Sequence, residues 1–276
     1  MCASGWLYDS GFVSLYDQSS AVYSNNAQMT LSGGSLTQDQ TSNLTVSNNS
    51  TWLLESGDFE LYTQASFLLS DSSTFSITGG SFSCSDNTTV NLARQGSMTI
   101  NGGSVSLASS SSLTMSSSSH IAISNGSLSM SDQSSLMSSA NSNTVVNGGI
   151  FTMSDSSSFI LSANSSLAVS GGGMALAGAN ATLIDSQLSV FAGSLSFGSS
   201  IVAQLVRSQI VVVAAADSSN STTMSMSMSG NNSSSSSQQQ SVTLSDSSTL
   251  IVQDGSMVQV TNGSFVASDY SSVQLT

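Results

Sequence analysis

The sequence predicts an all-β protein, a three-sided parallel β-helix whose coils are each 23 residues long. Three observations predict this fold: a glycine at a fixed interval, three apolar pairs that recur with it, and turn-forming residues between the pairs. A strict period in this range is typical of solenoids, in which each repeat stacks on its neighbours and buries a shared core. The glycine occurs eight times without interruption, at Gly11, Gly34, Gly57, Gly80, Gly103, Gly126, Gly149 and Gly172.

The apolar pairs give the strands. When the sequence is written in rows of 23 residues with this glycine at row position 11, apolar residues align at row positions 6 and 8, 13 and 15, and 21 and 23. A spacing of two places both members of a pair on one face of a strand. Each row therefore predicts three short strands, and equivalent strands of successive rows must stack in parallel. Only four of these 48 positions in the eight rows are polar: Gln38, Ser138, Thr144 and Thr182.

The periodic glycine is expected to form a corner. In Gly79-Gly80-Ser81-Phe82-Ser83-Cys84, the two glycines supply positive φ angles without a Cβ clash, and Phe82 and Cys84 point into the core. The chain contains no proline. This fits a stack in which every strand needs its N–H groups for the next coil.

The repeat divides the chain into three segments. Residues 1–213 are predicted to form coils, with the register shifting after Ile184. Residues 214–240 are a low-complexity segment of Met, Ser and Gln, and two interpretations remain: a looped-out insertion or one irregular coil. Residues 241–276 resume the solenoid pattern.

Composition excludes some classes of function. Only 6% of the residues are charged, the formal net charge is −13, and the two basic residues are Arg94 and Arg207. Phosphate recognition needs Lys and Arg, so we expect no nucleic-acid partner. The longest apolar stretch, residues 210–216, is too short for a membrane-spanning helix, so no membrane insertion is expected. The first residues lack the basic start of a signal peptide, and we expect a leader to be missing.

Catalytic residues are not predicted. Asp58 and Glu60 form the one close carboxylate pair on a strand, and they face outward without a basic residue nearby. His120, the only histidine, is expected in a turn, and no serine is paired with a histidine and an acid.

Cys2 and Cys84 fall in coils about 14 Å apart, beyond the reach of a disulfide. We expect Cys84 to be a buried core residue.

Calcium is the one candidate cofactor that the sequence indicates. Aspartates at row position 17 fall in adjacent rows, where stacked carboxylates and backbone oxygens would suit Ca²⁺. The alternative is an aspartate that caps its own turn. The metal candidates are Asp132, Asp155, Asp246 and Asp269.

Two outward rows are candidate surfaces. Row position 14 is rich in hydroxyls and could face a polysaccharide, order water as in ice-binding solenoids, or be an ordinary solvated face. This row reads Ser14, Thr37, Glu60, Ser83, Ser106, Ser129, Thr152 and Ala175. Row position 22 is partly apolar, and two interpretations remain: an interaction surface for lateral packing of fibres or a partner domain, or a row covered by a local turn or by residues 214–240. Its candidate residues are Leu68, Met137, Ile160 and Leu183.

Eleven Asn-x-Ser/Thr sequons occur in the chain. In a secreted eukaryotic protein, those in turns are candidates for glycosylation. They lie at Asn43, Asn48, Asn49, Asn87, Asn125, Asn164, Asn180, Asn220, Asn231, Asn232 and Asn262.

The Gly-Gly-Ser corner and the coil length resemble those of right-handed parallel β-helices, namely pectin-lyase-like proteins and the passenger domains of autotransporter and polymorphic outer-membrane adhesins. The resemblance implies right-handed coils and an extracellular or cell-surface location. In lyases of this fold it would also imply aspartates clustered with Arg or Lys. Here Arg94 and Arg207 are far apart in the sequence, which departs from that pattern.

We therefore expect an extracellular structural or adhesive β-solenoid: a stalk, coat or fibre segment, and no enzyme. Its expected partners are other copies or flanking coils stacked end to end, and a carbohydrate or cell-surface partner. The alternatives are a polysaccharide-processing lyase or hydrolase and an ice-binding solenoid.

Overall fold

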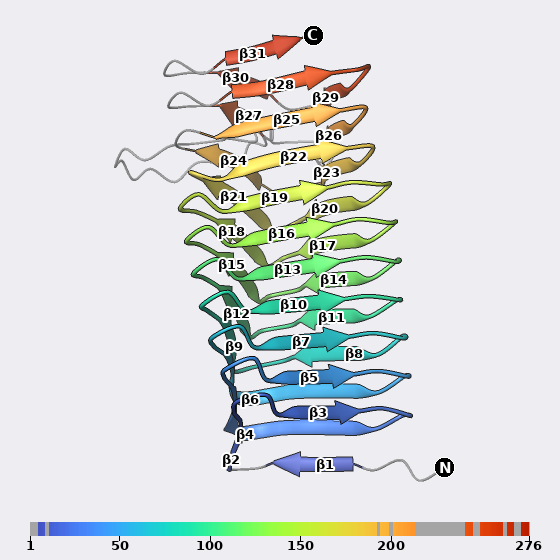
Figure 1. Cartoon of the computed structure of the whole chain (residues 1–276). Helices are drawn as coiled ribbons and strands as arrows, with labels where there is room; N and C mark the ends of the chain where they lie inside the picture. Colours follow the sequence, from blue (N-terminus) through green and yellow to red (C-terminus); the bar gives the residue numbers. More distant parts are fainter. Residues whose placement is uncertain are drawn as a thin grey trace.

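The chain forms a parallel β-solenoid, whose coils stack from β1 at one end to β31 at the other (Figure 1). The computed structural model describes residues 5–8, 11–191, 194–198, 201–213, 241–244, 249–261, 264–267 and 272–275. All pairings between the strands of these residues are parallel, and most join residues 23 positions apart, such as Val105 and Leu128. The predicted all-β solenoid with coils of about 23 residues is confirmed.

The strands form three stacked ladders, one for each apolar pair of the repeat. The first ladder contains β1 (Gly5–Tyr8), β4 (Gln28–Gln38), β6 (Thr51–Leu61), β8 (Thr74–Ile77), β11 (Ser97–Ile100), β14 (His120–Ile123), β17 (Asn143–Asn147), β20 (Ser166–Ser170), β23 (Gln187–Phe191), β26 (Gln209–Val213) and β29 (Met257–Thr261). The second contains β2 (Phe12–Leu15), the later halves of β4 and β6, β9 (Ser81–Cys84), β12 (Ser104–Leu107), β15 (Ser127–Met130), β18 (Ile150–Met153), β21 (Gly173–Ala177), β24 (Ser194–Gly198), β27 (Ser241–Leu244) and β30 (Ser264–Ala267).

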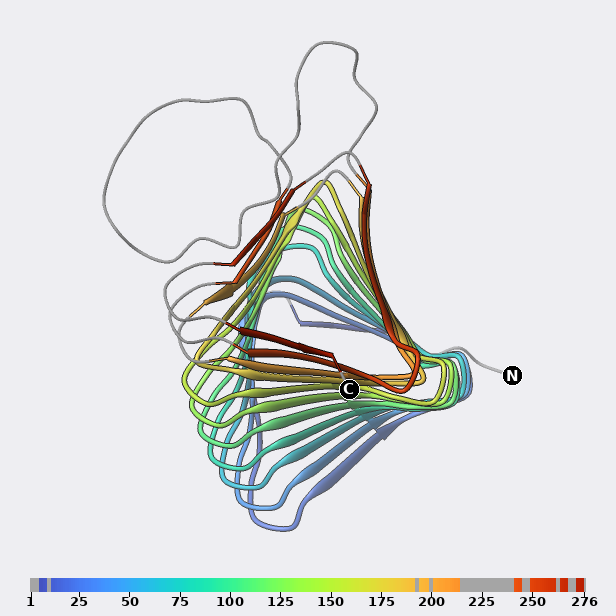
Figure 2. The same cartoon turned by 90° about the horizontal axis from the view of Figure 1, so that it is seen from above.

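The third ladder is a separate 11-stranded sheet. It contains β3 (Ser20–Tyr23), β5 (Asn43–Val46), β7 (Ser66–Leu69), β10 (Thr89–Leu92), β13 (Ser112–Met115), β16 (Ser135–Ser138), β19 (Ser158–Leu161), β22 (Asn180–Ile184), β25 (Val202–Val206), β28 (Thr249–Gln253) and β31 (Ser272–Leu275). Seen from above in Figure 2, strands of successive coils lie over one another around a common interior.

The glycine corner is not a break in every coil. β4 runs through Gly33 and Gly34, and β6 runs through Gly57, so in these two coils the corner is a bend within a continuous strand. The two long strands join the first and second ladders into one 20-stranded sheet. From β8 onward the corner lies outside the strands, as the glycine pairs predict.

The interior is lined by the apolar pairs, and aromatic rings stack along the axis because equivalent positions recur in each coil. Trp52 stacks on Phe75 with ring centroids 4.8 Å apart, and Phe59 stacks on Phe82 at 4.7 Å. Cys84 lies in the same core as predicted, and its burial raises the pKa of the thiol. Neighbouring coils therefore pack against one another through the core, as expected for a solenoid.

One predicted register is wrong. β22 pairs with β19 at a spacing of 22 residues, which places Ala181 beside Phe159 and Leu183 beside Leu161. Leu183 is therefore buried, with 1% of its surface exposed, and Thr182 points outward. The preceding coil turns through two residues with positive φ, Asp155 and Ser156, whereas here Gly178 alone has positive φ. The turn is one residue shorter, so the shift begins before Ile184.

The stack continues directly across residues 214–240. Ser196 on β24 lies beside Thr243 on β27, and Val202 on β25 lies beside Thr249 on β28. The strands on the two sides of this segment thus pair with each other in adjacent coils. Whether residues 214–240 form a loop or an irregular coil stays a prediction. Residues 214–240 themselves, and also Cys2, Asp246 and Asp269, lie outside the described residues.

Two further turns in most coils use residues other than glycine. Asp71 and Ser72 have φ angles of 54° and 60°, and Asp86 and Asn87 have angles of 59° and 62°. Such angles are strained for L-residues. They are stabilised by hydrogen bonds to the next coil, including one from Ser72 N–H to the carbonyl oxygen of Arg94 at 3.0 Å. The turns are therefore stacked as regularly as the strands.

Buried serines line the inner side of these turns. The Ser50 hydroxyl oxygen accepts a hydrogen bond from Ala27 N–H at 3.1 Å, and the Ser73 hydroxyl accepts one from Ser50 N–H at 3.1 Å. The hydroxyls satisfy backbone donors that would otherwise be buried without a partner. Sequence reasoning missed this ladder, although its signal is a serine at row position 4 in several rows.

Candidate interaction surfaces

The outer face of the second ladder carries a double row of serines. β9, β12 and β15 are successive strands, and each presents two serines outward while its apolar pair points inward. Ser83 lies beside Ser106, which lies beside Ser129. We call these six residues the hydroxyl face: Ser81, Ser83, Ser104, Ser106, Ser127 and Ser129.

The hydroxyl face has an acidic border on one side and an apolar border on the other. On β6, Asp58 and Glu60 face outward as predicted, and the Ser81 hydroxyl donates a hydrogen bond to the Asp58 carboxylate. Burial and the negative charge of Glu60 raise the pKa of Tyr62 nearby. On β18, Ile150 is 56% exposed. The surface thus changes along the axis from acidic through hydroxyl to apolar.

The partly apolar row at position 22 is smaller than predicted. Met137 on β16 is 42% exposed and lies beside Ile160 on β19. Leu68 on β7 is separated from them by the two coils that carry Asn91 and Thr114. Leu183, the fourth candidate, is a core residue. Its outward placement was wrong because the shortened turn at Gly178 moves it inward by one position.

The metal candidates Asp132 and Asp155 lie in adjacent coils at equivalent turns. Gln133 N–H donates to the Asp155 carbonyl oxygen at 3.0 Å, which joins the two turns. Each carboxylate accepts a hydrogen bond from the preceding serine, Ser131 at 3.0 Å and Ser154 at 2.7 Å, and not from its own backbone. Among the described residues no group of three or more His, Cys, Asp or Glu side chains could hold a metal ion. Calcium binding stays a prediction.

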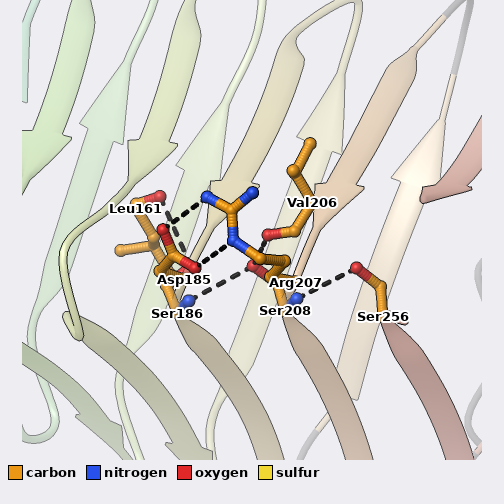
Figure 3. Close-up of polar contacts among 7 residues, drawn as sticks. All are labelled: Leu161, Asp185, Ser186, Val206, Arg207, Ser208 and Ser256. Atoms are coloured by element: carbon orange, nitrogen blue, oxygen red, sulfur yellow. Dashed lines mark hydrogen bonds and ion pairs between the residues drawn. The ribbon is translucent and has the colours of Figure 1, made fainter. Parts of the chain in front are cut away.

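Both arginines are paired with aspartates of the preceding coil. Arg94 Nε lies 3.3 Å from Asp71 Oδ1. Arg207 donates from Nε and Nη2 to the two carboxylate oxygens of Asp185, at 2.7 and 2.8 Å (Figure 3). The hydrogen bond from Arg207 lowers the pKa of Asp185. These pairs were missed from the sequence, although each arginine follows its aspartate by about one coil.

Figure 3 also shows the inner serine ladder beneath this ion pair. Ser208 Oγ accepts a hydrogen bond from Ser186 N–H at 3.2 Å, and Ser256 Oγ accepts one from Ser208 N–H at 2.9 Å. The ladder therefore joins the turns that precede β23, β26 and β29 in three successive coils.

His120 is the first residue of β14 and not part of a turn, because strands of the first ladder begin one residue before their first core residue. Its neighbours on the adjacent strands are Ser97 and Asn143. Burial lowers the pKa of its imidazole.

A shallow hollow elsewhere on the surface is lined by Asp71, Ser72, Arg94, Gln95 and Ser117.

The sequons that fall in the described part of the chain are all exposed. They are Asn43, Asn48, Asn49, Asn87, Asn125, Asn164 and Asn180. Asn220, Asn231, Asn232 and Asn262 lie outside the described residues. Their exposure is compatible with glycosylation, which stays a prediction.

Comparison with known proteins does not assign the chain to a family. No protein-family model matches it, and no curated protein matches it. Within the described ranges, no helix is long and apolar enough to span a membrane. Function is therefore argued from the surfaces above.

Proposed function

We propose that this protein is an extracellular structural or adhesive β-solenoid segment, located outside the cell or on its surface, that presents a rigid, hydroxyl-rich face. The observation that carries the proposal is the hydroxyl face, in which three successive strands each contribute two outward serines. A stalk, coat or fibre needs a surface that repeats at a fixed interval on a scaffold that does not bend.

Rigidity is supported by hydrogen bonds that join adjacent coils in strands and turns alike. In the ladder that carries the hydroxyl face, Val105 pairs with Phe82 on one side and with Leu128 on the other. In the turns, Asn87 N–H donates to the carbonyl oxygen of Ser109 at 3.0 Å, one coil away. Bending the stack would break several of these hydrogen bonds together.

The chemistry of the hydroxyl face suits a neutral, hydroxyl-rich partner. Serine hydroxyls both donate and accept hydrogen bonds, as do the hydroxyls of a carbohydrate. Both arginines, Arg94 and Arg207, are engaged with aspartates, which leaves little positive charge for phosphates. The proposed partner is a carbohydrate or another neutral cell-surface component.

The finer features of the fold belong to the same proposal. Three-sided, right-handed coils would make the chain similar to pectin-lyase-like proteins and autotransporter adhesins. Other copies, or flanking coils of a longer chain, would add strands next to β3 or β31, the outer strands of the 11-stranded sheet. Such end-to-end pairing would extend the solenoid through backbone hydrogen bonds between strands.

A binding comparison tests the proposed function. The wild type is incubated with insoluble polysaccharides and with whole cells beside two variants that gain the same charge, Ser83→Asp/Ser106→Asp/Ser129→Asp and Thr45→Asp/Asn91→Asp/Thr114→Asp. The first changes the hydroxyl face, and the second changes the third ladder in the same part of the stack. Loss of binding in the first variant alone is expected. Equal retention by all three proteins, or no binding by the wild type, would contradict the proposal.

A polysaccharide-processing enzyme is the second candidate, favoured by the hollow in which Asp71 lies beside Arg94. An aspartate with an adjacent cation is the pattern expected of a polysaccharide lyase of similar fold. Release of unsaturated products from a polyuronate by the wild type but not by Asp71→Asn would establish this activity. No product from the wild type would remove it.

Ice binding is the third candidate, favoured by the regular spacing of the serine rows on β9, β12 and β15. Strands in such a sheet are about 4.8 Å apart, which gives a regular array of hydroxyls for ordered water. Thermal hysteresis of the purified protein measures this activity directly. Its absence removes ice binding and leaves the adhesive function untouched.

A further inference from the structure

Three Asn-Gly dipeptides occupy the same corner of three successive coils. Asn101-Gly102 lies between β11 and β12, Asn125-Gly126 lies between β14 and β15, and Asn147-Gly148 lies at the end of β17, before β18. All three asparagines are exposed. We propose that Asn101 and Asn125 are sites of spontaneous deamidation in the folded protein and that Asn147 is protected from it.

The reaction needs only water. The backbone nitrogen of the glycine loses its proton to solvent base and bonds to the side-chain carbonyl carbon of the asparagine. The bond from that carbon to the amide nitrogen breaks, and ammonia leaves. Water then opens the resulting succinimide at either carbonyl, giving aspartate or isoaspartate. Glycine favours the attack because it has no side chain to obstruct the nitrogen.

Asn101 and Asn125 have the attacking nitrogen available. Both lie in corners outside the strands, and Asn125 has a φ angle of 58° while Gly102 has one of 105°. Among the hydrogen bonds of these two corners, none is donated by the N–H of Gly102 or Gly126; the nearest donors are Asn101 and Ser104 in one and Ser124 and Ser127 in the other. No hydrogen bond therefore has to break before the nitrogen reacts.

Asn147 is held differently, although its dipeptide is the same. It is the last residue of β17 and pairs with Ser170 on β20. Gly148 N–H donates a hydrogen bond to the Ser170 carbonyl oxygen at 3.2 Å. The attacking nitrogen is thus already engaged, and its hydrogen bond and strand pairing must open before the ring can close.

The modification would change the corner that leads into the hydroxyl face. Gly102 and Gly126 precede Ser104 and Ser127 by two residues and one residue, respectively. Each deamidation adds one negative charge to a formal net charge of −13. An isoaspartate also lengthens the backbone at a crowded corner, where a Cβ on Gly126 would lie 2.8 Å from the carbonyl oxygen of Gly103.

The experiment compares the three sites in one molecule. Purified protein is incubated in mildly alkaline buffer, folded and in concentrated guanidinium chloride, then digested with a protease and analysed by mass spectrometry. Aspartate and isoaspartate products are separated by chromatography. In the folded chain Asn101 and Asn125 are expected to convert severalfold faster than Asn147. In the unfolded chain the three rates are expected to converge, because each asparagine precedes glycine.

Two results would overturn the proposal. One is an equal rate at Asn147 and the other two sites in the folded protein. The other is conversion of Asn101 and Asn125 only after unfolding. The variant Asn101→Gln/Asn125→Gln serves as a control, since it should remove the products at these two positions and leave the rate at Asn147 unchanged. The inference does not depend on the proposed function, because neither binding nor activity is measured.

Discussion

Leu183 on β22 lies beside Leu161 on β19, one coil earlier, and both side chains are buried. The residue before it, Thr182, points outward. Leu183→Ala is therefore expected to lower the free energy of unfolding by about 2–5 kcal/mol, as other buried Leu-to-Ala changes do. Thr182→Ala should change it by less than about 0.5 kcal/mol. Urea denaturation measures both changes. A larger loss of unfolding free energy for Thr182→Ala than for Leu183→Ala would contradict the shifted register.

The glycine corner gives a second matched pair. A Cβ on Gly34 would collide with the carbonyl oxygen of Gly11 in the preceding coil, whereas a Cβ on Gly11 would meet nothing within 4 Å. Gly34→Ala is expected to destabilise the protein by about 1–3 kcal/mol, the usual cost of overpacking. Gly11→Ala should leave the unfolding midpoint nearly unchanged. Equal midpoints for the two variants would show that the corner is less crowded than described.

A charged substitution should have opposite effects at inward and outward positions of one strand. Leu128 on β15 is fully buried, and Ser129 next to it faces solvent. Leu128→Asp should unfold the surrounding coils, because a buried carboxylate without a partner is very costly. Ser129→Asp should not. Limited proteolysis and hydrogen exchange follow the effect, and full protease resistance of Leu128→Asp would contradict the register of this ladder.

The Asp185–Arg207 pair predicts a small pH dependence. The hydrogen bond from Arg207 lowers the pKa of Asp185 in the folded protein. A lowered folded-state pKa stabilises the protein above the unfolded value of about 3.9, and this contribution disappears as the pH falls through the folded pKa. Arg207→Gln should therefore lower the melting temperature slightly at neutral pH and not at strongly acid pH. Both side chains are largely exposed, so salt should also reduce the difference.

A difference that persists in strong acid would mean that Arg207 acts through packing and not through its charge. Arg94→Gln is the matched control, because Arg94 makes the equivalent contact with Asp71 at a longer distance of 3.3 Å. At neutral pH it should lower the melting temperature by less than Arg207→Gln does.

The strands could be predicted because alternation places each apolar pair on one face, and Phe82 and Cys84 point inward as that rule requires. The shift at Leu183 could not, because the sequence does not show that Gly178 replaces a two-residue turn. The inner serines were missed because Ser50 resembles the many outward serines in composition and local pattern.

The candidate surfaces could be located in part. Ser106 was placed outward by its position between two core residues, but the chemistry of a partner is not encoded by a motif. The pairing of Arg207 with Asp185 was hidden because the two residues lie 22 positions apart and not 23. Polar surface contacts depend on the local coil length, which the repeat gives only on average.

The central claim, that the hydroxyl face is the binding surface, is tested most directly by one pair of substitutions in a single coil. Ser106 on β12 lies on that face, and Thr114 on β13 lies on the third ladder. Affinity for a surface polysaccharide or for whole cells is measured for Ser106→Asp and Thr114→Asp, which add the same charge. We predict that Ser106→Asp weakens binding by about tenfold or more, equivalent to about 1.4 kcal/mol, and that Thr114→Asp leaves it unchanged. Equal affinities for the two variants would contradict the claim.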